Sequence, residues 1–202
     1  MAMKSTLRFF ILALTLAVVF TSTANAFIPV TGVAGLEATS KRLVSNSASP
    51  ASQINLGGEF NYSVVQQPKG NPGFVSTAAD ELTQFSLATR YGSQGFLAHN
   101  YLAGASFFDL VVGSQLTVTY ADGHRLTYMV REIRHLQAIN PNSPTTSFLD
   151  LDHGNVKLTT AQLFMQTYGV EDRLILQTCI AKDNELSWGR LFIIATPLRH
   201  VE

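Results

Sequence analysis

The chain has 202 residues, of which 46% are hydrophobic and 14% are charged, with 14 basic side chains, 14 acidic side chains and one cysteine. This apolar content excludes a disordered, collagen-like or polytopic membrane protein, and the balanced charge without a basic run argues against a nucleic-acid partner. A single cysteine cannot form an intramolecular disulfide, so we expect stability to come from burial and the thiol to be free.

The N-terminal segment, residues 1–26, is typical of a secretory signal peptide. Lys4 and Arg8 precede an apolar run from residue 9 to residue 20, and Ala24-Asn25-Ala26 has the small residues of a cleavage site. The run has about 12 residues, fewer than the roughly 20 that span a bilayer, which favours a cleaved signal over a retained signal anchor. We therefore expect export to the extracellular space or cell envelope, with membrane attachment only if the segment is retained.

Residues 27–58 are predicted to be a flexible linker. They are rich in Ser, Ala, Gly, Thr and Asn, include Pro50 and show no sustained apolar period. Residues 59–202 then remain as one domain of ordinary size.

Strand signals dominate this domain. Residues 116–120 and 125–133 alternate apolar and polar side chains, and Asp122-Gly123 lies between them, which predicts an antiparallel hairpin. Residues 173–180 and 188–196 are nearly continuous in Leu, Ile and Phe, as in strands buried on both faces or deep in a barrel.

Only short helices are expected. Residues 159–168 begin with an N-cap threonine and are followed by Gly169, and residues 77–82 are expected to form a helical turn. Residues 137–158 contain two prolines and several polar residues, which indicates a long loop between strands. Loops of that length are usually functional or disordered.

Cys179 stands near the end of the apolar run from residue 174 to residue 180. It is either a buried thiol that packs as a small hydrophobe or a reactive nucleophile, and a reactive thiol needs a base or a cation to favour its thiolate. Export favours the nucleophile, because an unpaired thiol is an oxidation liability outside the cell.

Two further residues suit a reactive thiol. His99 closes the predicted strand 96–99, and Arg190 lies within the second apolar run, where a guanidinium is costly unless it faces a cleft or an anionic partner. Acyl transfer creates an oxyanion that an arginine can stabilise. The simpler alternative is an arginine on the solvent side of an edge strand. The remaining histidines are expected to be solvated surface residues: His124, His135, His153 and His200.

The order of these residues resembles that of the sortases. That family carries a histidine at the end of an early strand, a cysteine at the end of a late strand in a Thr-Leu-x-Thr-Cys motif, and an arginine on the following strand. Here Leu176-Gln177-Thr178-Cys179 matches the last four motif positions, with His99 before it and Arg190 after it. The resemblance covers residues 94–196. The segment Phe107-Phe108-Asp109-Leu110 is also similar to the family.

Two positions depart from the sortase pattern. Ile175 stands where the family usually has threonine, and Ala98 replaces the glycine common before the histidine. Neither change removes a catalytic group, so the subclass is more affected than the chemistry.

The resemblance implies an all-β fold, a closed sortase-like β-barrel with a few short helices. It implies that Cys179 attacks a sorting motif near the C-terminus of another exported protein and forms a thioester. An amine acceptor, such as a cell-wall precursor or a pilin lysine, then resolves the thioester. His99 would act as acid and base, Arg190 would hold substrate or oxyanion with support from Thr178, and residues 137–158 would form one wall of the substrate groove.

Other functions are weighed against this one. An L,D-transpeptidase would need a His-Gly-Cys neighbourhood, which Gln177-Thr178-Cys179 does not supply, and in papain-like peptidases the cysteine precedes its histidine. A non-catalytic exported β-barrel that binds a ligand, with Cys179 merely packed, is the alternative from another class.

A metal site is not expected. Some sortases use calcium beside the groove, and Asp150, Asp152 and His153 raise the question here. The segment lacks the ligand count of a dedicated calcium site, so we expect a solvated loop and no cofactor.

Overall fold

The computed structural model describes residues 49–143 and 145–198. The predicted signal peptide and residues 27–48 of the predicted linker lie outside this part. Within it, no helix has the length and apolar character needed to cross a bilayer. The elements are, in chain order, β1 Ala51–Leu56, β2 Phe60–Gln66, β3 Glu81–Gln84, α1 Ser86–Thr89, β4 Gln94–Leu97, the 3-10 helix η1 Ala103–Asp109, β5 Gln115–Tyr120, β6 Arg125–Ala138, β7 Phe148–Asp150, β8 Val156–Leu158, α2 Thr160–Thr167, β9 Leu174–Lys182 and β10 Glu185–Pro197.

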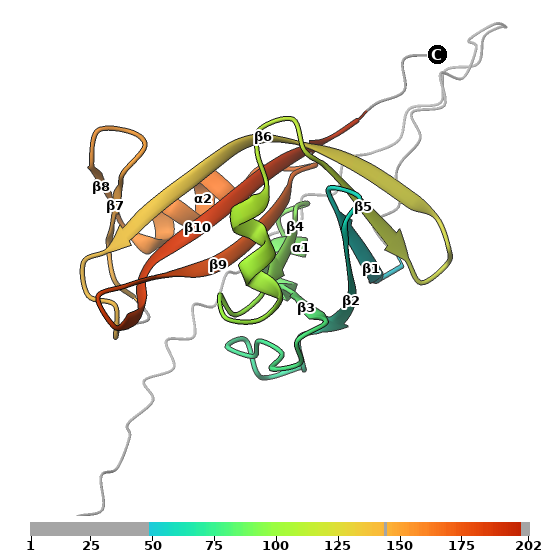
Figure 1. Ribbon diagram of the computed structural model, residues 1–202, viewed down its shortest axis with the longest axis horizontal. Helices are drawn as coiled ribbons and strands as arrows, with labels where there is room; N and C mark the ends of the chain where they lie inside the picture. The colour runs from blue at the N-terminus through green and yellow to red at the C-terminus, as the bar shows by residue number, and fades with distance from the viewer. Residues whose placement is uncertain (1–48, 144, 199–202) are drawn as a thin grey trace, which may run out of the picture. The chain divides into compact units, whose positions relative to one another are not determined.

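Eight of the strands close into a barrel (Figure 1). Around the ring they follow the order β1, β5, β6, β10, β9, β4, β3 and β2, and β2 pairs again with β1. The closure depends on β10, which pairs with β9 along one edge and with β6 along the other. The predicted all-β barrel with few short helices is therefore confirmed.

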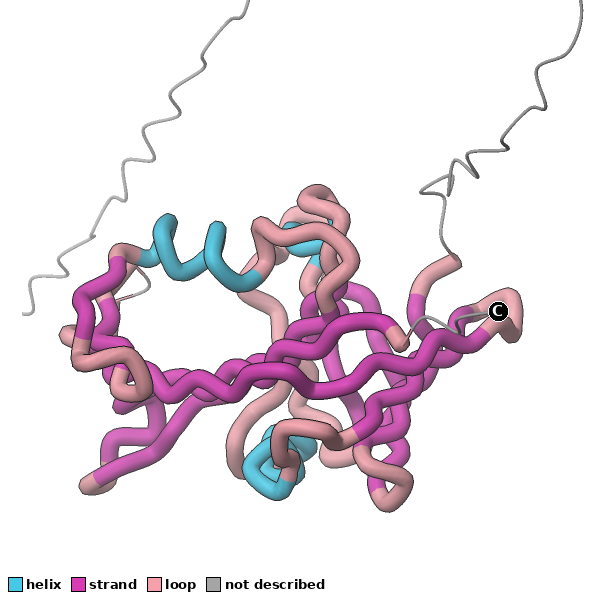
Figure 2. The backbone as a smooth tube through the Cα atoms, turned by 90° about the horizontal axis from the view of Figure 1, so that it is seen from above, coloured by secondary structure: helices cyan, strands magenta, loops and turns pink. Residues whose placement is uncertain are grey.

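The barrel interior holds the larger apolar cluster. Ile54, Leu82, Phe96 and Leu176 are fully buried there, each on a different strand. The helix η1 adds Phe107, also fully buried, to the same cluster. In Figure 2, η1 and α2 lie on opposite sides of the strands.

A second apolar cluster lies between the outer face of the barrel and α2. Leu163 of α2 and Tyr168 just after it pack with Ile175 of β9 and Phe192 of β10. The helix begins at the expected place, because the Thr159 side chain accepts a hydrogen bond from the Gln162 N–H in a capping box. The prediction of a helix here is confirmed.

The predicted hairpin is also confirmed. Strands β5 and β6 pair antiparallel, with Thr117 opposite Thr127, and Gly123 in the turn has φ of 86°, a conformation that suits glycine. Strand β6 runs further than predicted, to Ala138, because β10 pairs with it as far as Gln137.

The helical turn expected at residues 77–82 is wrong. Residues 81–84 form β3, which pairs parallel with β2, and the Ser63 N–H donates to the Asp80 carbonyl. Leu82 is fully buried in the barrel cluster. Pairing with a distant strand overrides the local helical signal.

The long loop expected at residues 137–158 is only partly a loop. Strands β7 and β8 form an antiparallel pair within it, and β7 extends the sheet from the end of β6, with Leu136 opposite Asp150. Each strand has three residues, too few for a periodic signal in the sequence.

The end of the predicted linker belongs to the barrel. Residues 51–56 form β1, paired with both β2 and β5. The alternation is obscured because the register shifts between Ala51 and Gln53, so only Ile54 and Leu56 mark the buried face clearly. The polar residues between them face away from the core and give the segment its linker-like composition.

Candidate active site

The alternation of side chains along β9 decides where Cys179 points. Leu174 and Leu176 belong to the barrel interior, whereas Ile175 belongs to the outer cluster beneath α2. Successive side chains of a strand point to opposite faces, so Gln177 and Cys179 lie on the outer face with Ile175. Cys179 is a free, half-buried thiol on the outside of the barrel.

Arg190 lies directly opposite Cys179 in the antiparallel β9–β10 pair. Directly opposite residues share a face, and their Cβ atoms are roughly 4.5–5.5 Å apart. The Arg190 Nη1 donates to the carbonyls of Ser187 at 3.0 Å and of Gly189 at 2.7 Å. The half-buried Arg190 side chain therefore starts opposite Cys179, and its guanidinium is held by carbonyls of its own strand.

Gly189 allows the strands to approach closely at this point. A Cβ on Gly189 would lie 2.4 Å from the Leu136 carbonyl oxygen on β6. Real Cβ atoms do not approach backbone oxygens so closely, so only glycine fits next to Arg190 in this register. The close packing of β6, β10 and β9 fixes the cross-strand position of the arginine.

His99 reaches the same edge of the barrel from β4, which runs parallel to β9. Leu97 is opposite Gln177, and the Ala98 N–H donates to the Gln177 carbonyl at 3.2 Å. The paired register ends at Leu97, so His99 follows β4 by two residues, at the start of the turn. His99 itself is half-buried. Within the described residues, no hydrogen bond joins the side chains of His99 and Cys179.

The turn after β4 holds His99 in place. The carbonyl of His99 accepts hydrogen bonds from the N–H groups of Leu102 and Gly104, at 3.0 Å and 3.1 Å. Its imidazole stacks on the ring of Tyr101, with centroids 5.2 Å apart and an angle of 21° between the planes. Tyr101 is largely exposed, so the stack leaves this side of the site open to solvent.

Thr178 lies between Gln177 and Cys179 on β9 and points to the opposite face. Its side chain is buried on the inner face, and its hydroxyl donates to the Ala98 carbonyl at 2.9 Å. This hydrogen bond links β9 to the residue that follows β4. The Thr178 hydroxyl points away from the face that carries Cys179. Thr178 therefore aligns β9 with the segment that follows β4, and the support of substrate or oxyanion that the resemblance implied stays a prediction.

Three contacts at the site were missed in the sequence. Tyr101 stacks on His99, Gly104 packs against Thr178, and the buried Tyr168 hydroxyl donates to the Gln177 amide at 2.8 Å. Burial raises the pKa of Tyr168, so its hydroxyl stays a donor. Only Tyr101 had a sequence signal, its position two residues after His99.

The other histidines within the described residues each pair with an aspartate. His124 pairs with Asp122, and His135 contacts Asp152 at 3.1 Å. Their side chains are exposed, as expected for surface histidines. His153, also exposed, lies 3.1 Å from Asp150, and His200 lies outside the described residues.

Asp150 of β7 forms a buried ion pair with Arg134 of the neighbouring strand β6. The guanidinium of Arg134 contacts the carboxylate and also donates to Gln166 of α2 at 3.1 Å, while His153 Nδ1 lies 3.1 Å from Asp150. Burial acts to raise the pKa of Asp150, but hydrogen bonds from Arg134 and His153 outweigh it and hold the pKa below its usual value. The carboxylate already has protein partners.

No protein-family model and no curated protein matches this chain. Among solved structures, it is similar to sortase C1 of Streptococcus suis, at 11% identity and a TM-score of 0.48, over 76% of this chain and 75% of that one. It is also similar to sortase C1 of Streptococcus agalactiae, at 12% identity and a TM-score of 0.45, over 74% and 69%. Sortase C of Clostridium perfringens SM101 gives 9% identity and a TM-score of 0.45, over 75% and 72%.

Proposed function

We propose that the protein is a sortase-type cysteine transpeptidase. The observation that carries the proposal is the pairing of Cys179 with Arg190 across β9 and β10. His99 follows β4, the strand that pairs with β9 on its other side, by two residues. A thiol, a permanent cation and an imidazole are the groups that acyl transfer requires.

In the first half of the reaction, the Cys179 thiolate attacks the carbonyl carbon of the scissile peptide bond while His99 is protonated. The new C–S bond pushes negative charge onto the carbonyl oxygen, and the guanidinium of Arg190 stabilises that charge. The C–N bond then breaks, and His99 gives its proton to the leaving amine. A thioester on Cys179 and a free amine result.

In the second half, an amine acceptor attacks the thioester. His99 takes the proton from the incoming nitrogen, the new C–N bond forms, and the C–S bond breaks to restore the thiolate. The number of peptide bonds is unchanged. The substrate is a sorting motif on an exported protein, and the acceptor is an amine of a cell-wall precursor or a pilin lysine. Both reactants lie in the extracellular space or cell envelope, and the predicted N-terminal signal would bring the enzyme there.

The stacked pair of His99 and Tyr101 supports the acid and base role. A ring contact on one face of the imidazole limits its rotation and leaves the nitrogen-bearing edge free for proton transfer. The carbonyl of His99 anchors the following turn, so the imidazole is held by the backbone as well.

The test is capture of the acyl-enzyme. The full chain is incubated with a peptide library that varies the sorting motif, and intact mass is measured before and after addition of hydroxylamine, a strong amine nucleophile. We expect a mass gain equal to the N-terminal part of one peptide, which hydroxylamine removes. Cys179→Ala should give no adduct. Peptide cleavage that continues in the Cys179→Ala variant would contradict the proposal.

A further inference from the structure

A hollow lies on the opposite side of the barrel from Cys179. Its side chains come from β1, β2, β5 and β6, and β1 is separated from β9 by three strands in either direction around the ring. The hollow has a volume of about 240 Å³. Its polar lining side chains are Gln53, Asn55, Asn61, Thr117, Thr119 and Arg125.

The polar side chains form two rows across the sheet. In one row Gln53 is opposite Thr119 on β5, and Thr119 is opposite Arg125 on β6. In the other row, Asn55 lies between Asn61 and Thr117. The backbone beneath them is paired on all four strands, so the groups stand on a rigid floor and binding would cost little ordering.

The second row is already engaged within the protein. The Asn55 amide donates to Asn61 at 2.9 Å, and Thr117 shares a hydrogen bond of 3.2 Å with Thr127. In the first row, the side chains of Gln53, Thr119 and Arg125 have no hydrogen-bond partner within the described residues. The hollow therefore presents an amide, a hydroxyl and a guanidinium that are free to bind a ligand.

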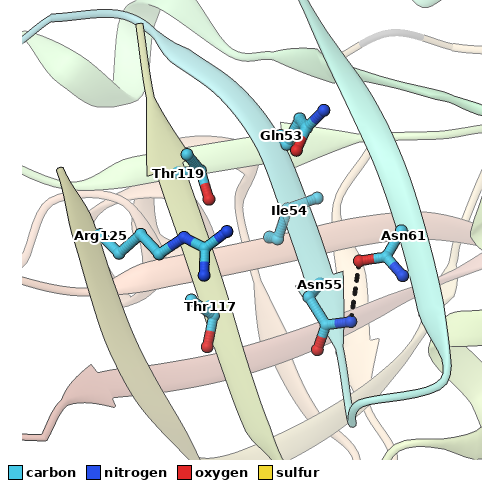
Figure 3. A pocket seen from close by; sticks show the side chains of 7 residues that line it. All are labelled: Gln53, Ile54, Asn55, Asn61, Thr117, Thr119 and Arg125. Atoms are coloured by element: carbon cyan, nitrogen blue, oxygen red, sulfur yellow. Dashed lines mark hydrogen bonds between the residues drawn. The ribbon is translucent and has the colours of Figure 1, made fainter. Parts of the chain in front are cut away.

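Arg125 gives the hollow its charge. Figure 3 shows its side chain lying across β5, with the guanidinium between Thr117 and Thr119 and directed toward β1. No carboxylate is among the described residues that line the hollow. An arginine fork suits a carboxylate through two parallel hydrogen bonds, and asparagine and glutamine at neighbouring strand positions are unusual, because strands favour β-branched and aromatic residues.

We propose that this hollow binds one unit of an acidic saccharide, with the sugar carboxylate on Arg125 and sugar hydroxyls on Gln53 and Thr119. Amide and hydroxyl side chains both donate and accept, as a polyol requires, and the guanidinium selects the acid. The volume lies below the roughly 300–1,000 Å³ of typical small-molecule pockets, which suits a single sugar ring. The site is independent of the proposed transpeptidase activity.

The test is an NMR titration of the full chain with three probes: glucuronate, glucose and acetate. We expect glucuronate to shift the amide signals of Gln53, Thr119 and Arg125 with a dissociation constant in the millimolar range, and glucose and acetate to bind at least tenfold more weakly. If glucose bound with the same affinity as glucuronate, the assignment of an acidic ligand would be overturned. Shifts by acetate of equal strength would overturn the saccharide assignment, and no local shift with any probe would overturn the site.

Two variants sharpen the result. Arg125→Gln should weaken glucuronate binding at least tenfold, and Arg125→Lys should restore only part of it because the fork is lost. Arg131→Gln is the matched control, since Arg131 lies on the same strand outside the hollow and contacts Thr196. Equal loss in both glutamine variants would indicate a nonspecific charge effect and overturn the proposal. Cys179→Ala should bind glucuronate normally whatever its effect on transpeptidation.

Discussion

Arg190 and Cys179 are direct partners across two antiparallel strands, and this relationship depends on register. A shift of one residue would turn one of the two side chains toward the barrel interior, because side chains alternate between faces. Gly189 secures the register, since a side chain there would meet the Leu136 carbonyl. The geometry of the site is therefore built into the strand pairing.

The position of Cys179 on the outer face predicts that the thiol reacts in the folded protein. A methanethiosulfonate reagent should label it in native buffer, at a rate within about tenfold of that in denaturant, as measured by intact mass. Complete protection in native buffer, with labelling only after denaturation, would favour the non-catalytic barrel.

Arg190→Ala should lower turnover of a cleaved sorting peptide by roughly 10²–10³-fold, the usual effect of removing one oxyanion donor. Arg190→Lys should recover only part of the rate, because an ammonium lacks the planar fork. Both variants should melt close to the parent protein. The arginine is half-exposed, and its hydrogen bonds among residues 49–143 and 145–198 go to backbone carbonyls of its own strand. Arg131→Ala serves as the control, and an equal loss of turnover there would argue against a specific role.

Gly104→Ala should damage both stability and activity. A Cβ at Gly104 would lie 2.4 Å from the Thr178 hydroxyl and 2.7 Å from the His99 carbonyl, which is backbone and cannot move freely. We expect a loss of about 1–3 kcal/mol in the free energy of unfolding, the usual cost of overpacking. Denaturant unfolding measures it. Gly73→Ala is the matched control, because nothing lies within 4 Å of a Cβ there.

The buried pair of Arg134 and Asp150 predicts an acid-sensitive contribution to stability. The pKa of Asp150 is lowered in the folded state, so its contribution is present above the unfolded value of about 3.9 and is lost as pH falls through the folded pKa. Asp150→Asn should cost about 3 kcal/mol or more at neutral pH, because it leaves Arg134 buried without its partner. Thermal melts from acidic to neutral pH measure the effect.

The exposed neighbour of Asp150 provides the control for that experiment. Asp152→Asn removes a carboxylate that contacts His135 at the surface, where an ion pair contributes about 1 kcal/mol or less. Equal destabilisation by the two variants would show that burial of the Arg134 pair is not the cause.

Calcium is expected to have no effect on turnover. Asp150 is held by Arg134 and His153, and Asp152 contacts His135, so a metal would have to displace existing partners. Turnover in EDTA should equal turnover with added calcium. A rise of tenfold or more on calcium addition would contradict this expectation.

The strands that carry the site could be predicted because their sequences are distinctive. Cys179 and Arg190 stand in long apolar runs, and these runs form β9 and β10. The helix over residues 160–167 was recognisable from its N-cap threonine and the glycine that follows. In each case the signal is local, and the chain context agrees with it.

The remainder depends on partners that lie far away in the chain. Strand β3 owes its conformation to parallel pairing with β2, and β1 hides its alternation behind a register shift. The role of Thr178 could not be inferred from its motif position, because which face of β9 turns inward is decided by packing against β4 and η1. Short strands such as β7 and β8 carry too few residues to show a period.

The closing strand has a consequence for the order of events during folding. Strand β10 is the last of the strands along the chain, and it supplies both the closure of the barrel and the partner of Cys179. Until it docks, β9 has a free edge and the thiol has no cation opposite it. A chain synthesised from its N-terminus therefore acquires the Cys179–Arg190 pair only when the barrel is complete. In the proposed mechanism, the cation opposite the thiol is thus the last part of the site to be added.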